Sequence, residues 1–163
     1  MLTDTENMAC PEERGDFGTV DEASRYETFS EEETFRLGEK IAKSALPGVY
    51  ALEGDLGAGK TVFAKGFAAG LGISENITSP TFTIMQVYDA GEKKLYHYDA
   101  YRIEDPEELE EIGYTDYFYG DGICLVEWAG NIASYLPEHY TCILIDRDND
   151  RGFDYRRITV KDI

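Results

Sequence analysis

The sequence has few basic residues and no long apolar run, and each shortage excludes a class of protein. Its 15 Lys and Arg residues face 33 Asp and Glu, and the resulting net charge of −18 repels polyphosphate chains. We therefore expect no binding to DNA, and none to tRNA by this chain alone. No apolar stretch approaches the roughly 20 residues that a membrane-spanning helix needs. The first residues, MLTDTENMACPEERGD, also lack a basic segment followed by an apolar one. We expect no membrane association and a cytoplasmic location.

Cysteine is scarce as well. Cys10, Cys124 and Cys142 are an odd number of residues without the spacing of a metal site. Cys124 and Cys142 lie inside apolar runs, where a free thiol behaves as a small hydrophobic side chain. Because free cysteines are among the most frequently buried residues, we expect all three to be structural thiols.

The 163 residues have the length of one domain, and their 42% hydrophobic and 29% charged residues are typical of a globular protein. Residues 1–24 contain seven acids and one base and lack apolar periodicity. They therefore predict an acidic, disordered tail. Residues 25–163 are the expected folded domain.

Strands and helices alternate along that domain. Apolar or alternating runs predict strands at 26–29, 49–52, 82–88, 94–99, 123–126, 140–145 and 156–160. Helices are expected after Ser30, which can cap the amide of Glu33, over residues 62–71, and after Pro106. Such alternation predicts a three-layer α/β domain.

The strongest motif is GDLGAGKT at residues 54–61, which matches G-x-x-x-x-G-K-[ST] between a predicted strand and a predicted helix. Glycines let backbone amides converge on phosphate oxygens, and the helix start adds unpaired N–H groups and a positive dipole end. Lys60 would place its charge near the β and γ phosphates, and the Thr61 hydroxyl would bind the bridging Mg²⁺. We therefore expect a P-loop NTPase-like domain with a mixed, mainly parallel central sheet. Its ATP-binding residues in this segment would be Asp55, Leu56, Gly57, Ala58, Gly59, Lys60 and Thr61.

A P-loop needs a further acid for its metal, usually at the end of a neighbouring apolar strand. The run at 123–126 ends at Glu127, which makes this carboxylate the candidate for the metal or the attacking water. Trp128, the single tryptophan, is a candidate for a nucleotide contact, with packing in the core as the alternative. Arg156 or Arg157 could approach the nucleotide, and spacing alone does not choose between them.

Four segments follow one another in an order that resembles the TsaE family, the bacterial P-loop ATPases of tRNA threonylcarbamoyladenosine synthesis. They are GDLGAGKT at 54–61, SPTF at 79–82, HYDAYR at 97–102 and LVEW at 125–128, with DPEEL at 105–109 before the last. The resemblance covers about residues 26–160. It implies an ATPase that acts with the TsaB and TsaD proteins to modify adenosine 37 of tRNAs reading codons that begin with A. Contact with tRNA would be indirect, through that complex.

The resemblance also implies roles for individual residues. Thr61 and Glu127 would hold Mg²⁺, Thr81 would sense the γ phosphate or the metal, and Asp99 would assist the metal or the attacking water. We therefore expect Lys60, Glu127 and Asp99 as the catalytic residues. His97 shares a strand face with Asp99, where a histidine is more often structural than catalytic. The roles of Tyr101 and Arg102 stay open.

Two other functions fit the same motif. The first is a nucleotide-gated binding module, in which ATP would order residues 78–82 and dock a partner, and hydrolysis would only reset it. For the ATPase itself, no arginine finger is evident in the sequence, so we expect slow turnover by the isolated chain and a partner that completes the site. A small-molecule kinase is less favoured, because the short region after Glu127 holds few bases to screen a transferred phosphate.

Overall fold

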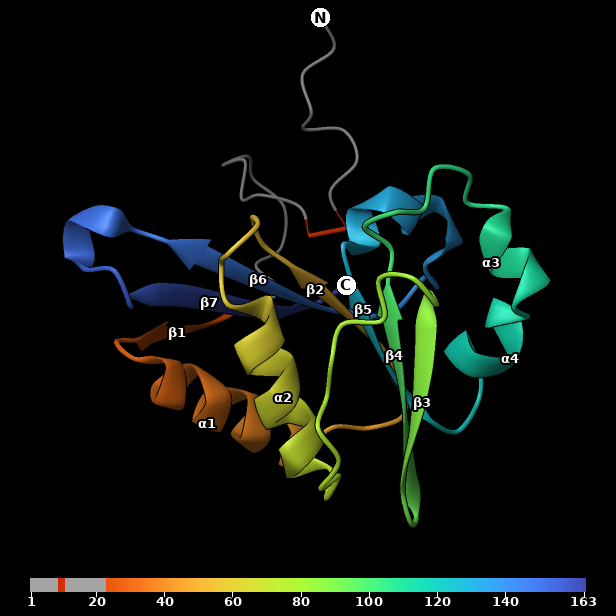
Figure 1. Ribbon diagram of the computed structural model, residues 1–163, viewed down its shortest axis with the longest axis horizontal. Coiled ribbons are helices and arrows are strands. Elements are labelled where there is room, and N and C mark those ends of the chain that lie inside the picture. Colours follow the sequence, from red (N-terminus) through yellow and green to blue (C-terminus); the bar gives the residue numbers. More distant parts are fainter. Residues whose placement is uncertain (1–8, 11–22) are drawn as a thin grey trace, which may run out of the picture.

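The computed structural model describes residues 9–10 and 23–163, and one seven-stranded sheet organises the longer range (Figure 1). The strands are β1 (Ser24–Thr28), β2 (Gly48–Glu53), β3 (Met85–Ala90), β4 (Lys93–Asp99), β5 (Ile123–Glu127), β6 (Thr141–Arg147) and β7 (Arg156–Asp162). The α-helices are α1 (Glu31–Lys43), α2 (Lys60–Gly70), α3 (Glu108–Glu111) and α4 (Tyr114–Phe118), and η1 (Ala129–Tyr135) and η2 (Asn149–Arg151) are 3₁₀ helices.

The sheet has the order β1-β7-β6-β2-β5-β4-β3 and is mixed, as predicted. Its centre is parallel, since β2 pairs in parallel with β5 and β6, and β5 does so with β4. The outer pairs β1–β7, β6–β7 and β3–β4 are antiparallel. The strands with unbroken apolar runs, β2 and β5, lie at this centre and are buried along nearly their whole length. Parallel neighbours end at the same edge of a sheet, so the residues that follow β2 and β5 lie close together.

Helices cover both faces of the sheet, which confirms the three layers (Figure 1). Successive residues of β2 point to opposite faces. Tyr50 and Leu52 pack in the cluster with α1 and α2, and Val49 and Ala51 pack in the cluster with α3, α4 and η1. The helices α1 and α2 approach so closely that a Cβ at Gly66 would collide with the carbonyl group of Phe35.

The predicted start of α1 is confirmed. Ser30 Oγ accepts a hydrogen bond from the amide of Glu33 (3.1 Å), and Glu33 Oε2 accepts one from the amide of Phe29 (2.8 Å). The first contact satisfies an amide that the helix itself leaves unpaired, and the second ties the helix to the residue before its N-cap. They anchor the end of α1 that borders the P-loop.

The strand predicted at 82–88 begins three residues later than expected, at Met85. The preceding residues form a turn, in which Ile84 has a left-handed φ of 65° and its carbonyl accepts from the amide of Asp99 (2.9 Å). The helix expected after Pro106 is the single turn α3, and α4 and η1 were not predicted. These short helices span too few residues for apolar periodicity to reveal them.

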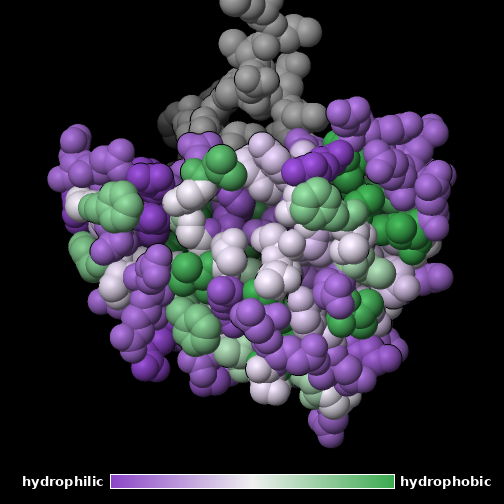
Figure 2. All heavy atoms as spheres, viewed as in Figure 1, coloured by the Kyte–Doolittle hydropathy of each residue, from purple (hydrophilic) through white to green (hydrophobic). Residues whose placement is uncertain are grey.

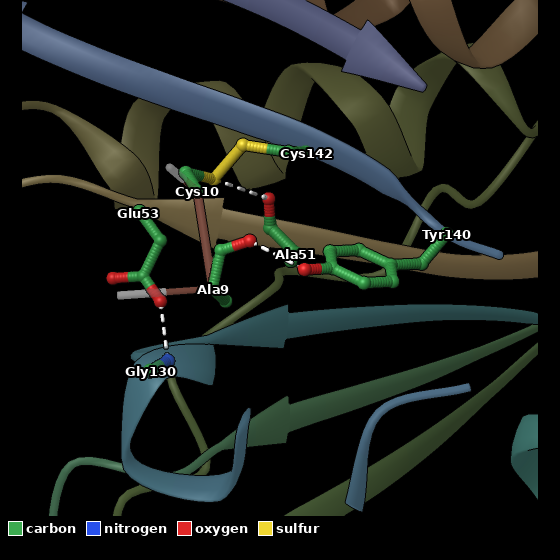
Figure 3. Close-up of a disulfide and its surroundings, with 7 residues drawn as sticks. All are labelled: Ala9, Cys10, Ala51, Glu53, Gly130, Tyr140 and Cys142. Carbon is green, nitrogen blue, oxygen red and sulfur yellow. Dashed lines mark hydrogen bonds between the residues drawn. A yellow bond between two sulfur atoms is a disulfide. The ribbon is translucent and has the colours of Figure 1, made fainter. Parts of the chain in front are cut away.

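The prediction of three structural thiols is wrong for Cys10 and Cys142, which form a disulfide (Figure 3), and is confirmed for the buried free Cys124. The two bonded residues are 132 positions apart, a distance at which sequence alone shows no proximity. Cys142 lies in β6 opposite Ala51 of β2. Only the fold brings Cys10 to that place.

Ala9 and Cys10 are buried at 2% and 1% exposure, and Tyr140 donates a hydrogen bond to the carbonyl of Ala9 (2.6 Å, Figure 3). Ala9 packs in the same cluster as Val49 and Ala51, on the face of β2 opposite α1 and α2. These two residues therefore belong to the packed core. The other residues of the predicted tail, up to 22, lie outside the described part of the chain.

The surface is largely hydrophilic, as expected for a sequence with many charged residues. Hydrophilic side chains dominate the outer edge of the face in Figure 2, and hydrophobic ones show at separate spots. Within residues 9–10 and 23–163, no helix is long and apolar enough to span a bilayer.

The disulfide should stabilise the fold, because it restricts the unfolded chain over a loop of more than 130 residues. We expect reduction of the oxidised protein to lower Tm by about 5–15 °C. Thermal unfolding followed by circular dichroism, with and without reductant, measures this shift. Cys10→Ser is the control, since its Tm should not respond to reductant. Equal Tm values for the oxidised and reduced wild type would contradict a stabilising role.

Candidate functional site

The loop between β2 and α2 has the backbone of a phosphate cradle. Gly57 and Gly59 have φ values of 78° and 103°, in the left-handed region that favours glycine. Gly59 is the N-cap of α2, and no side chain caps that helix start. The first amides of α2 therefore have no side-chain acceptor, which is the arrangement that binds an anion at a helix N-terminus.

Lys60 folds back onto this loop. Its Nζ donates hydrogen bonds to the carbonyl oxygens of Gly54 (2.5 Å) and Asp55 (2.9 Å), and it lies 4.2 Å from the centre of the Trp128 ring. Burial lowers the pKa of Lys60, and nearby carboxylates, Glu127 foremost, oppose this by raising it. The ammonium group is thus held in the loop by carbonyls, an aromatic ring and surrounding acids.

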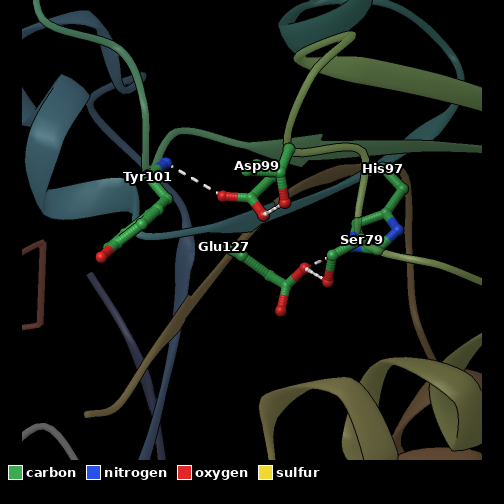
Figure 4. A network of polar contacts seen from close by, with 6 residues as sticks. Ser79, His97, Asp99, Tyr101 and Glu127 are labelled. Atoms are coloured by element: carbon green, nitrogen blue, oxygen red, sulfur yellow. Dashed lines mark hydrogen bonds and ion pairs between the residues drawn. The ribbon is translucent and has the colours of Figure 1, made fainter. Parts of the chain in front are cut away.

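Two acids lie side by side at the ends of β4 and β5. Asp99 and Glu127 are opposite each other in the parallel register and are 4% and 2% exposed. Glu127 Oε2 accepts hydrogen bonds from Ser79 Oγ (2.9 Å) and His97 Nε2 (2.8 Å, Figure 4). The SPTF segment and β4 therefore both contact the acid that sequence reasoning selected.

Asp99 is held by two further hydrogen bonds. Its Oδ2 accepts from Thr81 Oγ1 (3.1 Å), and its Oδ1 accepts from the amide of Tyr101 (2.9 Å, Figure 4). Tyr101 also packs against Trp128, with 4.9 Å between ring centres. Trp128 therefore has the packing contacts that the sequence offered as its alternative role, and it also borders the cavity described next.

A cavity of about 410 Å³ brings most of the expected site residues together. Of those residues it is lined by Leu56, Gly57, Gly59, Lys60, Thr61, Thr81, Asp99, Glu127 and Trp128. Asp55 and Ala58 do not line it. Asp55 contributes its carbonyl to Lys60, and Ala58 is buried with its carbonyl bonded to Arg156.

The structure adds cavity residues that the sequence did not select. They are Glu31, Thr34, Val62 and Asp154, and the cavity is also lined by Ser79 of the SPTF segment and by Tyr101, whose role stayed open. Of the two arginines left open, Arg156 borders the cavity, and its Nε donates to the carbonyl of Ala58 (2.6 Å). Arg157 faces Asp146 instead, at 3.7 Å. Neighbouring residues of a strand point to opposite faces of the sheet. The fold therefore places Arg156 at the cavity and Arg157 away from it, which the sequence could not decide.

Buried Glu53, at the end of β2, is another residue that sequence reasoning missed. Its Oε1 accepts a hydrogen bond from the amide of Gly130 (2.5 Å, Figure 3), which joins the strand before the P-loop to η1. Burial raises the pKa of Glu53, and the Gly130 amide and Lys60 oppose that shift. No motif includes Glu53, so its acidic character in an apolar strand was the only signal.

The oxygen donors of the cavity suit Mg²⁺ bound together with phosphate. Thr61 and Glu127 both line it and supply a hydroxyl and a carboxylate. The described residues contain no group of three or more His, Cys, Asp or Glu side chains that could hold a metal ion alone. Mg²⁺ does not need one, because it commonly takes one or two protein ligands and completes its shell with phosphates and water.

A family model described as "Threonylcarbamoyl adenosine biosynthesis protein TsaE" matches residues 28–158. The chain belongs to the TsaE family. Its relatives include the "tRNA threonylcarbamoyladenosine biosynthesis protein TsaE" of Bacillus subtilis (strain 168), 50% identical over 83% of each chain. The protein of the same name from Treponema pallidum (strain Nichols) is 46% identical over 70% of this chain and 84% of its own.

The fold of this TsaE-family chain is also similar to a solved structure. That structure, titled "Crystal structure of Bacillus subtilus YdiB", has a TM-score of 0.71 and 43% sequence identity, and the match covers 88% of this chain and 87% of the other. The resemblance inferred from four short segments therefore holds for most of the chain.

The lowered pKa of Lys60 leads to a pH-dependent prediction. The folded chain disfavours the ammonium relative to the unfolded chain, where a lysine has its ordinary pKa of about 10.4. We expect wild-type stability to rise, relative to Lys60→Met, as the pH increases from the lowered folded pKa to that value. Thermal unfolding of both proteins between pH 7 and 10.5 measures the difference. A Tm difference that does not change with pH would contradict the prediction.

Proposed function

We propose that this chain binds ATP with Mg²⁺ and hydrolyses it during the threonylcarbamoylation of adenosine 37 in tRNAs that read codons beginning with A. The observation that carries the proposal is the shared cavity of the P-loop, Thr61 and Glu127. Membership of the TsaE family and the names of its relatives support the pathway. TsaB and TsaD are the proposed partners.

In this proposal the chain positions phosphates and neutralises their charge, which is most of what phosphoryl transfer asks of a protein. The amides of residues 57–61 and the ammonium of Lys60 bind phosphate oxygens, so Lys60 leaves the carbonyls that hold it here. Thr61 and Glu127 would hold Mg²⁺, which would supply charge neutralisation for the phosphates. Asp99, beside Glu127, orients the attacking water or a water of the metal.

Turnover by the chain alone should be slow. Among the described residues, Lys60 and Arg156 are the basic side chains that line the cavity. Arg156 donates from Nε and Nη1 to the carbonyls of Ala58, Phe153 and Tyr155, which hold its guanidinium beside the P-loop. A group from a partner would complete the site and accelerate hydrolysis.

The charge of −18 supports an indirect contact with tRNA, through the partner proteins. A cytoplasmic location is part of the proposal, because the tRNA to be modified is there. In that compartment disulfides are reduced or serve as redox sensors, so the Cys10–Cys142 bond would respond to the redox state of the cell.

One alternative has an observation in its favour. Ser79 and Thr81 of the SPTF segment bond to Glu127 and Asp99, the two acids of the site. ATP and Mg²⁺ would compete for these contacts and rearrange the segment, as in a nucleotide-gated binding module.

A small-molecule kinase is disfavoured. Only two basic side chains line the cavity within the described residues, which leaves no further base to screen the phosphate on its way to an acceptor.

The metal ligands give the first test of the proposal. We expect Thr61→Ala and Glu127→Gln to lower Mg²⁺-dependent ATP hydrolysis on the order of 100-fold, because each removes a metal ligand. Phosphate release measures the rate. Thr61→Ser, which keeps the hydroxyl, and Glu138→Gln, an exposed residue outside the cavity, are the controls. Unchanged hydrolysis by both ligand variants would refute the assignment.

The pathway is tested by reconstitution with TsaB, TsaD, ATP, bicarbonate, threonine and tRNA. We expect modified tRNA only when this chain is present, because its ATP turnover drives the complex in the proposal. Mass spectrometry of the nucleosides measures the yield. An equal yield without the chain would refute the role in modification and leave nucleotide binding to be judged separately.

At ATP and Mg²⁺ concentrations that saturate the variant, Glu127→Gln also separates hydrolysis from gating. If hydrolysis is essential, the variant should still capture the partners in the presence of ATP and fail to support modification. If ATP binding alone suffices, the variant should both capture the partners and support modification. Pull-down with ATP, ADP or no nucleotide, together with the reconstituted assay, distinguishes these results.

A further inference from the structure

His97 is a buried histidine whose two ring nitrogens have very different surroundings. It lies in β4 between Gln86 of β3 and Leu125 of β5, and it is 1% exposed. Nε2 is 2.8 Å from Oε2 of Glu127, whereas Nδ1 has no hydrogen-bond partner among the described residues. The only hydrogen bond of the His97 ring within the described residues therefore goes to one carboxylate oxygen.

The chemistry of the two groups shows which of them donates the hydrogen bond. An ionised carboxylate only accepts hydrogen bonds, so Nε2 must carry the proton and donate. With the proton on Nε2, Nδ1 can be the nitrogen without one, and the ring then leaves no buried N–H group without an acceptor. The ring acts toward Glu127 as a fixed donor.

Glu127 Oε2 receives two hydrogen bonds, one from His97 and one from Ser79 (Figure 4). None of the hydrogen bonds within the described residues reaches Oε1, and Figure 4 shows that oxygen turned away from both donors. Since Glu127 lines the cavity, Oε1 is the oxygen left to bind a ligand there.

The two donors differ in how firmly they are held. Ser79 belongs to the irregular segment between α2 and β3, whereas His97 is paired on both sides within the sheet. A rearrangement of residues 79–82 would remove the serine contact and leave the histidine contact in place. His97 is therefore the donor that can fix the carboxylate in every state of the loop.

We propose that His97 is a positioning residue that holds Oε2 of Glu127 so that Oε1 is presented to Mg²⁺. The inference rests on the proposed function, because it assumes that Glu127 binds the metal. Partners that orient a metal ligand commonly change metal affinity by 10–100-fold. The histidine that sequence reasoning favoured as structural thus acts on the metal site through its neighbour.

Three substitutions test this role. His97→Leu removes the donor, His97→Asn keeps an amide that is too short to reach Oε2, and His97→Gln places an amide near the position of Nε2. We expect the Leu and Asn variants to need about 10-fold more Mg²⁺ for half-maximal binding of ATP. The Gln variant should stay within about 3-fold of wild type, as expected for a replacement donor.

Isothermal titration calorimetry with ATP at a series of Mg²⁺ concentrations measures this dependence without relying on turnover. Binding of ATP in EDTA is the internal control and should be equal in all four proteins. Asn and Gln differ in reach and share the same amide, so their comparison decides the inference even if the Leu variant does not fold. Equal Mg²⁺ dependence in Asn, Gln and wild type would overturn it. Absence of Mg²⁺-dependent binding in the wild type would instead refute the proposed function.

Discussion

The parallel pairing of β2 with β5 is the constraint on which the rest of this structure depends. Leu52 and Glu127 are opposite each other in that register, so the P-loop that follows β2 and the acid that ends β5 meet at one sheet edge. The adjacent parallel strand β4 brings Asp99 to the same edge. A shift of one residue in either register would turn these carboxylates to the other face. The geometry of the cavity therefore follows from backbone hydrogen bonds in the buried centre of the sheet.

The cavity differs from the rest of this acidic chain because basic side chains line it. The chain carries −18, yet Lys60 and Arg156 border the cavity together with the uncapped start of α2. Lys60 is retained there against the cost of its burial, which lowers its pKa. Two basic side chains thus lie at the proposed phosphate site, and four carboxylates, those of Glu31, Asp99, Glu127 and Asp154, line the same cavity. The net charge of the chain agrees with the proposed indirect contact with tRNA.

Much of the fold was predictable because its signals are local. Apolar runs located β2 and β5, Ser30 and Glu33 located the start of α1, and the glycines before Lys60 located the phosphate loop. The start of β3 was predicted too early, because the turn before it is held by Asp99, a residue from the next strand. The disulfide partner of Cys10 was not predictable for the same reason, since 132 residues separate the two sulfurs.

The sequence by itself determined the class of site that we propose: a glycine-rich loop, a lysine, a hydroxyl and an acid at a strand end are together the pattern of a phosphate and metal site. Only the tertiary structure decided which neighbours act on them. It selected Arg156 over Arg157, tied Ser79 and His97 to one oxygen of Glu127, and placed Ala9 and Cys10 in the core. Motifs record what each residue can do, whereas contacts across 30 to 132 positions depend on strand order and register, which no local pattern contains.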